Sequence, residues 1–424
     1  MSEKLIEQLN APKKEDRLAA LKELMALHKS GVLPMPTKTE SVNNHIHTTY
    51  SFSPYSPTKA VYMAYKAGLK TAGIMDHDTI AGAKEFLEAG EIAEMACTIG
   101  FEARVKMCGS NFYDRRFNNP DQKSVAYVAC HGVPHQNIDK VDEFLKIRRI
   151  KRNERNKKQV EKINKLIKES GIVLSFEDDV LPISLYNEGG TITERHILYA
   201  LSLKLIDLYG KGKFLVDFLK DTLKIELSPK LEATLLYEHS DFYEYSLLGA
   251  LKSNLVEKFY IDADEECPTV KEFCDFVKEI GGISAYAYLG DVGDSVTGDK
   301  KAQKFEDELL DDLLVELKDI GFNAITFMPT RNTKMQLARL MIKCKELGFF
   351  EICGEDVNSP TQSFVYEELI KPEFNHLITA TWALIGHEQS ASEDISYSMF
   401  SETTKKRFPI LKDRINYFYE LGKI

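Results

Sequence analysis

The stretch Asn44-His45-Ile46-His47-Thr48-Thr49-Tyr50-Ser51 places two imidazoles two positions apart. In an extended strand successive side chains alternate between the two faces, so His45 and His47 point to one face and Ile46 to the other. Serines and prolines follow at positions 51–57, so the pair is expected at the carboxyl end of its strand, where α/β folds bind ligands. Two imidazoles on one face predict a metal site. In isolation, the same stretch would also fit a polar edge strand whose histidines face water.

The composition bounds the classes of protein that the chain can belong to. Its 424 residues are enough for two or three domains, and 43% of them are apolar, which is ordinary for a globular protein with a sizeable core. The formal net charge of −10 argues against a general nucleic-acid coating protein, which needs a broad positive surface. It leaves room for a small phosphorylated substrate.

Cysteine usage and hydropathy indicate the compartment. Seven cysteines without a Cys-x-x-Cys pair argue against a disulfide framework and against a disulfide-linked partner. The amino-terminal region has no hydrophobic signal core, and no apolar run approaches the roughly 20 residues that a membrane span needs. We therefore expect a cytoplasmic protein without a membrane partner.

The hydrophobic periodicity divides the chain into four parts. Residues 1–40 are expected to form an amino-terminal helical extension. Strands alternate with helices over 41–135 and again over 270–395, which predicts a largely parallel sheet or barrel whose two portions are separated along the chain. Residues 136–269 are mostly helical in pattern and are interpreted as an insertion. Residues 396–424 form a polar carboxyl-terminal tail.

The predicted strands of the alternating portions end in metal-ligand residue types or in a cation. Beyond the histidine pair, these residues are Asp76-His77-Asp78, Glu102, His131, Arg331 and Asp356. Each one alone has an ordinary explanation, such as a surface carboxylate or a helix cap. A parallel barrel would bring all these strand ends into one ring. Imidazoles and carboxylates without thiolates suit zinc, manganese or iron rather than calcium.

Two reaction types fit such a site. A pair of ions can activate water and stabilise both the attacking and the leaving oxygen of a phosphoryl transfer. The other common reaction is hydrolysis of a carbon–nitrogen bond. Arg331 favours a phosphate because a guanidinium matches its oxygens in bidentate fashion, although a surface ion pair fits its position equally well.

Several motifs together resemble one known family. Residues 44–51, the Met-Asp-His-Asp-Thr-Ile-Ala-Gly at 75–82 and the Gly-Phe-Glu at 100–102 resemble the first motifs of the PHP superfamily, the polymerase and histidinol phosphatase group of metal-dependent phosphoesterases. Weaker similarity extends over roughly residues 41–390, and its further motifs are His131, Gly281-Gly282-Ile283, Phe327-Met328-Pro329 and Gly354-Glu355-Asp356.

The helical block resembles one branch of that superfamily, which includes nucleotide and short-RNA phosphoesterases. In that branch a long basic helix leads to a Gly-Arg-Pro-His segment. Here only the histidine remains, in Thr193-Glu194-Arg195-His196.

The resemblance implies an α/β fold, namely a distorted (β/α)7 TIM-like barrel with up to three metal ions in its mouth. It implies metal ligands at His45, His47, Glu102 and Asp356 for one ion, at Glu102 and His131 for a second, and at His77 for a third. Apart from the resemblance, we expect catalytic roles for Arg331 and His77, which would steady a phosphate. The expected substrate contacts are Arg331, His196, Tyr288 and Asn358.

Three positions depart from the family pattern. Phe52 stands where an acid is expected, Tyr288 replaces the histidine of an Ala-His-Pro motif, and Asn358 replaces the histidine of a final Asp-x-His motif. The third metal position therefore lacks most of its ligands and the second is weakened. We expect one to two divalent ions of zinc, manganese or iron. Asp291 and Asp294 are candidate replacement ligands, on sequence proximity alone.

The leading hypothesis is a phosphoesterase in which a metal-activated hydroxide attacks a small phosphorylated substrate, such as a nucleotide or a short RNA. One alternative is a degenerate barrel that binds a metal or a phosphorylated ligand without turnover, and another is a metal hydrolase of carbon–nitrogen bonds. Residues 146–158 hold eight basic residues and one acid. They would either clamp a nucleotide or RNA backbone or form a solvated helix face.

Overall fold

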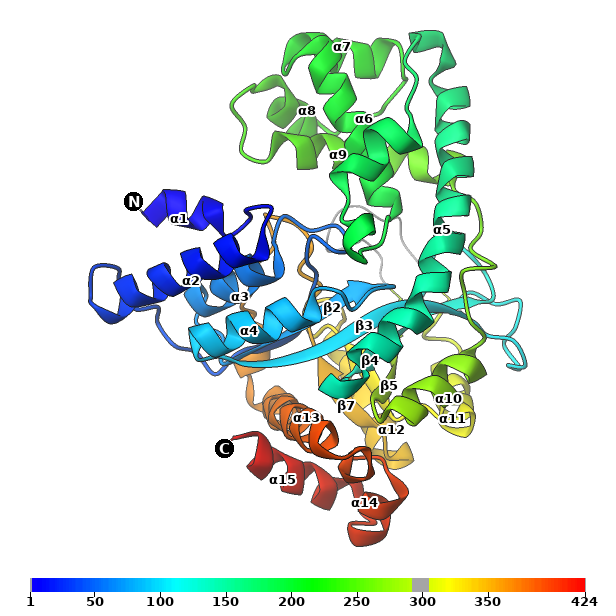
Figure 1. Cartoon of the computed structure of the whole chain (residues 1–424). Coiled ribbons are helices and arrows are strands. Elements are labelled where there is room, and N and C mark those ends of the chain that lie inside the picture. Colours follow the sequence, from blue (N-terminus) through cyan, green and yellow to red (C-terminus); the bar gives the residue numbers. More distant parts are fainter. Residues whose placement is uncertain (1, 292–304, 424) are drawn as a thin grey trace.

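Seven strands form one sheet that closes almost completely into a barrel in the computed structural model, which describes residues 2–291 and 305–423 (Figure 1). In sheet order the strands are β1 (Val42–Ile46), β2 (Thr71–His77), β3 (Ala96–Lys106), β4 (Val125–His131), β5 (Ile283–Tyr288), β6 (Ala324–Phe327) and β7 (Phe350–Cys353). An isolated parallel bridge between Ile46 and Val357 joins the first strand to the segment that follows the last. The predicted α/β class and distorted barrel are confirmed.

One strand runs against the others. β4 pairs antiparallel with both β3 and β5, whereas the remaining neighbours in the sheet are parallel. β3 and β4 are therefore a hairpin, and the parallel ends of β1, β2 and β3 lie at the same rim of the barrel. This rim carries the predicted site residues.

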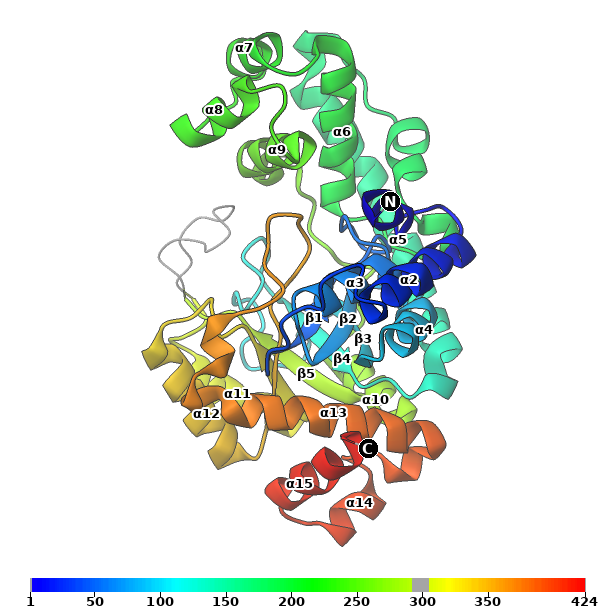
Figure 2. The same cartoon turned by 90° about the vertical axis from the view of Figure 1, so that its left-hand side faces the viewer.

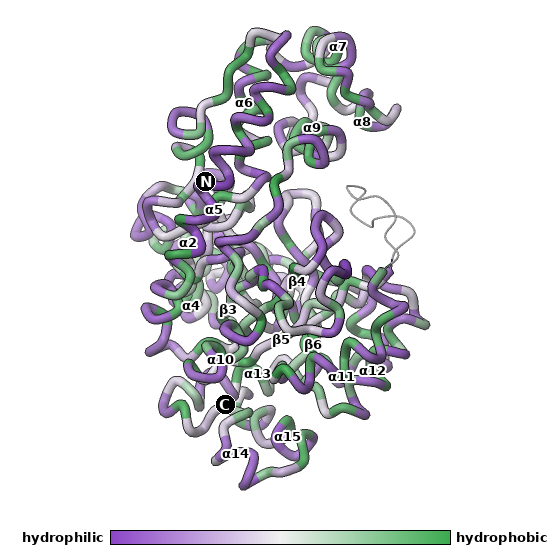
Figure 3. Tube along the Cα trace, turned by 90° about the vertical axis from the view of Figure 1, so that its right-hand side faces the viewer, coloured by the Kyte–Doolittle hydropathy of each residue, from purple (hydrophilic) through white to green (hydrophobic). Residues whose placement is uncertain are grey.

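Helices cover the outside of the barrel because their apolar residues recur every three or four positions. In α10, for example, Val270, Phe273, Cys274 and Val277 are buried. The surrounding helices are α3 (Pro57–Lys66), α4 (Ala83–Ala93), α10 (Val270–Ile280), α11 (Leu310–Ile320) and α12 (Lys334–Leu347). Figure 3 shows hydrophilic and hydrophobic residues mixed along these helices, as expected for elements with one buried face.

The opposite end of the barrel is closed by the carboxyl-terminal helices α13 (Asn375–Glu393), α14 (Glu402–Arg407) and α15 (Leu411–Gly422) (Figure 2). Inward-facing strand residues such as Met75 and Ala285 share a hydrophobic cluster with Leu384 of α13 and Phe418 of α15. The α13–α15 contact is very close, since a Cβ added at Gly386 would lie 2.0 Å from the carbonyl oxygen of Phe418.

The amino-terminal helices α1 (Ser2–Gln8) and α2 (Lys14–Lys29) pack against the barrel helices α3 and α4. Leu18, Leu21 and Leu24 of α2 are buried there, in the same cluster as the outer face of the sheet. Arg17 of α2 makes a buried ion pair with Glu85 of α4, with 2.5 Å between Nη2 and Oε2.

The helices between β4 and α10 bury a second hydrophobic cluster of their own. They are α5 (Ile138–Leu166), α6 (Glu194–Tyr209), α7 (Lys213–Asp221), α8 (Pro229–Leu236) and α9 (Tyr243–Phe259). Figures 1 and 2 show α6 to α9 standing beyond one end of the barrel, with the long α5 running alongside both parts. Phe52, from the loop after β1, belongs to this second cluster rather than to the barrel core. We call residues 136–269 the helical block.

Short turns complete the described chain. They are 3₁₀ turns at His135–Asn137, Lys168–Ser170, Leu181–Ile183, Tyr186–Glu188, Glu367–Ile370, Pro372–Phe374 and Ile395–Tyr397, and a π turn at Phe176–Val180. Among the helices that the structure describes, none is long and apolar enough to span a bilayer.

Candidate metal centre

Two imidazoles and a carboxylate converge at the rim of the barrel. His45 Nε2 lies 3.2 Å from His47 Nε2 and 3.7 Å from Glu102 Oε2. His47 Nε2 lies 3.9 Å from the same oxygen of Glu102. All three side chains are buried, and one donor atom from each lies within 4.8 Å of the others. Three potential metal ligands from β1, the residue after it and β3 therefore meet at one point, and the shared face of His45 and His47 is as the spacing of the first motif predicts.

Two more predicted residues lie against these three. Asp356 Oδ1 is 3.2 Å from His47 Nε2, because the bridge between Ile46 and Val357 brings the segment after β7 to the end of β1. His77, at the end of β2, places Nδ1 3.0 Å from Glu102 Oε2, and its ring centroid lies 4.6 Å from that of His47.

His131 is a further buried imidazole that the sequence predicts as a metal ligand. It pairs with Gly100 across the β3–β4 hairpin and is 1% exposed. Its Nε2 is buried without a hydrogen-bond partner in the described part of the chain. Burial, reinforced by the nearby His45, lowers the pKa of His131 to about 3 and keeps the ring neutral. A buried polar nitrogen without a partner is rare and unfavourable. Coordination of a cation would satisfy it, so the residues present fit a metal ion.

The tautomer of His47 is set by its other neighbours. Ser51 Oγ donates its single hydrogen to Asp76 Oδ1 at 2.6 Å. The contact of 3.0 Å between Ser51 Oγ and His47 Nδ1 must then be donated by the imidazole. With the proton on Nδ1, the lone pair of His47 is on Nε2, which faces the other donors. Thr48 also donates to Asp76 through both its backbone nitrogen and its hydroxyl, at 2.6 Å each.

The ionisation states of the side chains at the centre favour a bound cation. Burial opposes ionisation of Glu102, but the charges and hydrogen bonds of His77 and His45 outweigh it and hold the pKa of this carboxyl well below its ordinary value. The same balance, with His47 as the main partner, keeps the pKa of Asp356 well below its ordinary value. For His45 the hydrogen bond and charge of Glu102 overcome burial and raise the pKa, whereas burial lowers the pKa of His47. Both carboxylates are ionised at neutral pH.

Tyr288 does not lie in this cluster. Along β5 the inner positions belong to Ile283 and Ala285, and Tyr286 and Tyr288 belong to the outer hydrophobic cluster. The Tyr288 hydroxyl donates to Asp307 Oδ1 at 2.6 Å. The expected substrate contact is thus corrected, because strand alternation turns this side chain away from the barrel interior.

Asp291, one of the two candidate replacement ligands, has other hydrogen-bond partners. Oδ1 of Asp291 accepts hydrogen bonds from three successive backbone N–H groups, those of Phe305, Glu306 and Asp307. It is therefore committed to holding that turn. Asp294 lies outside the described residues.

The other predicted contacts fall around the rim. Asn358 touches the cluster directly, since its Nδ2 donates to Asp356 Oδ1 at 2.6 Å. Arg331 Nε donates to the carbonyl oxygen of Leu289 at 3.1 Å, which ties the loop after β6 to the loop after β5. His196 is buried and its Nδ1 accepts from the backbone nitrogen of Thr193 at 3.1 Å, as part of the cap of α6. Its role toward a substrate stays a prediction.

Phe52, at the position of an expected acid, packs against the helical block. Its ring makes edge contacts with His196 and Tyr199, with centroids 5.0 and 5.5 Å apart, and its φ is +88°. A positive φ is unusual for a bulky residue and persists only where packing holds it. Phe52 therefore connects the loop after β1 to α6 by aromatic contacts.

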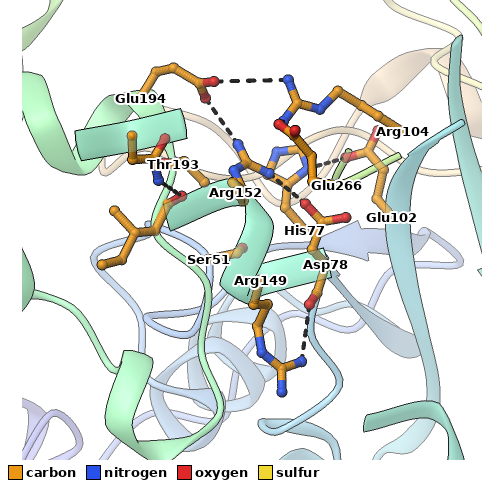
Figure 4. Close-up of polar contacts among 12 residues, drawn as sticks. Ser51, His77, Asp78, Glu102, Arg104, Arg149, Arg152, Thr193, Glu194 and Glu266 are labelled. Carbon is orange, nitrogen blue, oxygen red and sulfur yellow. Dashed lines mark hydrogen bonds and ion pairs between the residues drawn. The ribbon is translucent and has the colours of Figure 1, made fainter. Parts of the chain in front are cut away.

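Beside the cluster lies a network of buried charges that the sequence reasoning missed (Figure 4). Arg152 of α5 bridges Asp78 at 2.5 Å and Glu194 at 2.9 Å. Arg155 bridges Glu194 at 2.7 Å and Glu266 at 2.5 Å. Arg104 lies 3.3 Å from Glu266. Arg152 and Arg155 are therefore neither solvated nor free to clamp a nucleic-acid backbone. Their three-residue spacing was the available signal, since it places them on one helix face.

Comparison with known proteins agrees with this fold. The described chain is an α/β barrel in which His45, His47 and Glu102 lie close together. Residues 43–218 match the family model of the PHP domain.

Two solved structures have a similar fold. One is a candidate metal-dependent phosphoesterase from Bifidobacterium adolescentis, 21% identical, with a TM-score of 0.52 over 80% of this chain and 94% of that chain. The other is an amidohydrolase from Chromobacterium violaceum with bound sulfate and no metal, 14% identical, with a TM-score of 0.51 over 80% of this chain and 96% of that chain. No curated protein matches the sequence significantly.

Proposed function

We propose that the protein is a metal-dependent hydrolase that acts on phosphate esters. The observation that carries this proposal is the convergence of His45, His47 and Glu102, with Asp356 at 3.2 Å from His47 and the unpartnered His131 nitrogen beside them. The PHP domain and the printed name of the Bifidobacterium neighbour favour a phosphate ester. The printed name of the other neighbour keeps amide hydrolysis as the competing reaction.

In this proposal His45, His47, Glu102 and Asp356 would hold one divalent ion, and Glu102 and His131 would contribute to a second. The mixed imidazole and carboxylate donors suit zinc, manganese or iron. When bound, such an ion acts as a Lewis acid on phosphoryl oxygens and makes water nucleophilic at neutral pH.

The residues of the chain itself have distinct tasks. Ser51 and Asp76 hold the proton of His47 on Nδ1 and so keep Nε2 available as a ligand. His77, whose side chain is 29% exposed, holds a proton at Nδ1 against Glu102, which leaves its Nε2 as the nitrogen able to exchange a proton with a substrate. Arg331 is proposed as a phosphate ligand, because the loops after β5 and β6 lie at the same rim as the cluster.

The substrate class that we propose is a small phosphorylated compound, with a nucleotide as the narrower candidate. The network with Asp78, Glu194 and Glu266 neutralises buried arginines of residues 146–158. The basic stretch therefore offers less charge to a long RNA backbone than its composition indicates.

The test is an activity panel with manganese or zinc. Phosphate monoesters, phosphodiesters and cyclic amides would be offered to the wild-type chain, to His47→Ala and to Asp356→Ala. We expect turnover of a phosphate ester that falls by on the order of a hundredfold or more in both variants, because loss of outer-shell partners of a metal alone reduces activity by 10–100-fold. The matched control is His376→Ala, which removes an exposed histidine paired with Glu351 at 3.2 Å. Undiminished hydrolysis in both ligand variants would refute the proposal.

A second candidate function is binding without turnover. It is favoured by Phe52, which fills the position of an expected acid and contacts α6. A chain that binds manganese but hydrolyses no member of the panel would support this candidate. Turnover of cyclic amides alone would support the carbon–nitrogen hydrolase.

A further inference from the structure

One side chain of the helical block reaches the candidate metal centre. Arg195, in the first turn of α6, donates from Nη1 to the side-chain oxygen of Asn358. Asn358 in turn donates from Nδ2 to Asp356 Oδ1 at 2.6 Å. That carboxylate oxygen is the one that lies 3.2 Å from His47 Nε2. Two hydrogen bonds in series therefore connect α6 to a proposed metal ligand.

The guanidinium of Arg195 is held from several sides. Its central carbon lies 5.0 Å from the centroid of the Phe52 ring, within cation–π range. The residue before it, Glu194, is fixed by ion pairs to Arg152 and Arg155. The residue after it, His196, closes the cap of α6 on Thr193. The position of Arg195 thus follows from the way the helical block docks on the barrel.

The two hydrogen bonds determine which way the side-chain amide of Asn358 points. A guanidinium can only donate hydrogen bonds, so the amide must turn its oxygen toward Arg195. Its NH₂ group then faces the ionised carboxylate of Asp356, which can only accept hydrogen bonds. If Arg195 were removed, the amide could reverse and bring its oxygen against the carboxylate. The backbone of Asn358 is fixed independently, because its nitrogen donates to Gln362 Oε1 at 2.8 Å.

We propose that Arg195 is a positioning residue that acts through Asn358 to orient Asp356 toward the metal ion. This inference rests on the proposed metal centre and adds the helical block to it. Outer-shell hydrogen bonds to metal-binding carboxylates align the ligand, and their loss typically lowers metal affinity by about 10–100-fold. Arg195, held by the Phe52 ring and the Asn358 amide, thus links the docking of the helical block on the barrel to the affinity of the centre for a metal ion.

The experiment is a manganese titration of the full-length chain, with free Mn²⁺ measured by electron paramagnetic resonance. The variants are Arg195→Met, Asn358→Leu and the combination of both. We expect each single variant to weaken Mn²⁺ binding by about tenfold or more. The combination should weaken it no further than the single variants, since the two residues act in one series and their effects are not additive.

Arg148→Met is the matched control. Arg148 also lies in the helical block with its guanidinium carbon over a ring, 4.2 Å from the Phe144 centroid. We expect its Mn²⁺ affinity to equal that of the wild type. Wild-type affinity in Arg195→Met, or losses that add in the combination, would overturn the inference. Absence of Mn²⁺ binding by the wild-type chain would instead refute the proposed metal centre, so the two failures are distinguishable.

Discussion

His47 shows how much of the centre depends on single residues. Its position at the end of the strand determines which way the side chain points, but Ser51 and Asp76 determine which ring nitrogen carries the proton. The spacing of His45 and His47 was sufficient to predict a shared face, and Glu102 could be predicted as a partner from its place on a later strand. Ser51 could not be assigned by pattern alone, because a serine after a strand is equally typical of a turn.

A buried acid away from the centre gives a pH prediction. Glu306 is 1% exposed and accepts from the Tyr286 hydroxyl at 2.7 Å and the Gly290 backbone at 2.7 Å. Burial outweighs these hydrogen bonds and raises its pKa to about 7, from an ordinary 4.5. The folded state therefore holds the proton more tightly than the unfolded state. This contribution to stability is fully present below pH 4.5 and is lost as the pH rises through 7.

We expect the unfolding free energy of the wild type to fall by about 3 kcal/mol more than that of Glu306→Gln between pH 5 and pH 8.5, at roughly 1.4 kcal/mol per pKa unit. Urea denaturation at the two pH values measures the difference. Equal pH dependence in the two proteins would show that Glu306 is not the titrating group.

At the scale of elements, the sequence was a good guide to the strands and a poor guide to their directions. The strands β5, β6 and β7 all lie within residues 270–395, where an alternation of strands and helices was expected. The antiparallel direction of β4 was not predictable, since alternation within a strand carries no information about its partner. The outward orientation of Tyr288 was missed for a related reason, because a motif match does not fix which face a residue occupies.

Two arginines of the basic run in α5 have acidic partners that the sequence pattern could not reveal. Arg152 and Arg155 look like residues of a solvated face because their acidic partners, Glu194 and Glu266, are distant in the sequence. A count of charges within one helix cannot reveal partners that only the fold brings near. Buried ion pairs of this kind can be recognised once the helices are placed in space.

The attachment of α2 to α4 yields an element-scale prediction. Arg17 and Glu85 form a two-point contact, 2.8 Å at Nε and 2.5 Å at Nη2, with both side chains less than a tenth exposed. Arg17→Met would leave the Glu85 carboxylate buried without its cation, which costs about 3–5 kcal/mol. Urea denaturation should show this loss of unfolding free energy.

The neighbouring pair of Lys14 and Glu88 is the control, because these side chains are 40% and 44% exposed. Lys14→Met should change the unfolding free energy by less than about 1 kcal/mol, as is usual for exposed pairs. Similar losses in the two variants would mean that burial of the Arg17 pair does not anchor α2.

At the scale of the whole molecule, the helical block and the barrel meet in a balanced set of buried charges. Three arginines, Arg104, Arg152 and Arg155, face three acids, Asp78, Glu194 and Glu266. Figure 4 labels all of these residues except Arg155. The arginines come from β3 and α5, and the acids come from the loops after β2 and α9 and from α6. This set ties α6, and with it Arg195, to the rim that carries the metal centre.

Removal of one charge from this set should weaken the docking of the helical block on the barrel. Glu194→Gln leaves three buried cations with two anions and should destabilise the docking by about 3–5 kcal/mol. Amide hydrogen exchange should show faster exchange in α6 to α9 with little change in the barrel strands. The control Glu232→Gln alters a pair between Lys220 of α7 and Glu232 of α8, whose side chains are 46% and 31% exposed, and it should leave exchange unchanged. Uniform acceleration across the barrel would contradict a local docking role.

The most direct test of the metal centre is the number of ions bound per chain after equilibrium dialysis against manganese or zinc. Glu102 lies within 4 Å of three of the four histidines at the rim, so it is central to every ion that the site could hold. We predict between one and two ions per wild-type chain and a clear loss of bound metal in Glu102→Gln. A wild-type chain that retains no metal, or a Glu102→Gln chain that retains as much as the wild type, would contradict the account.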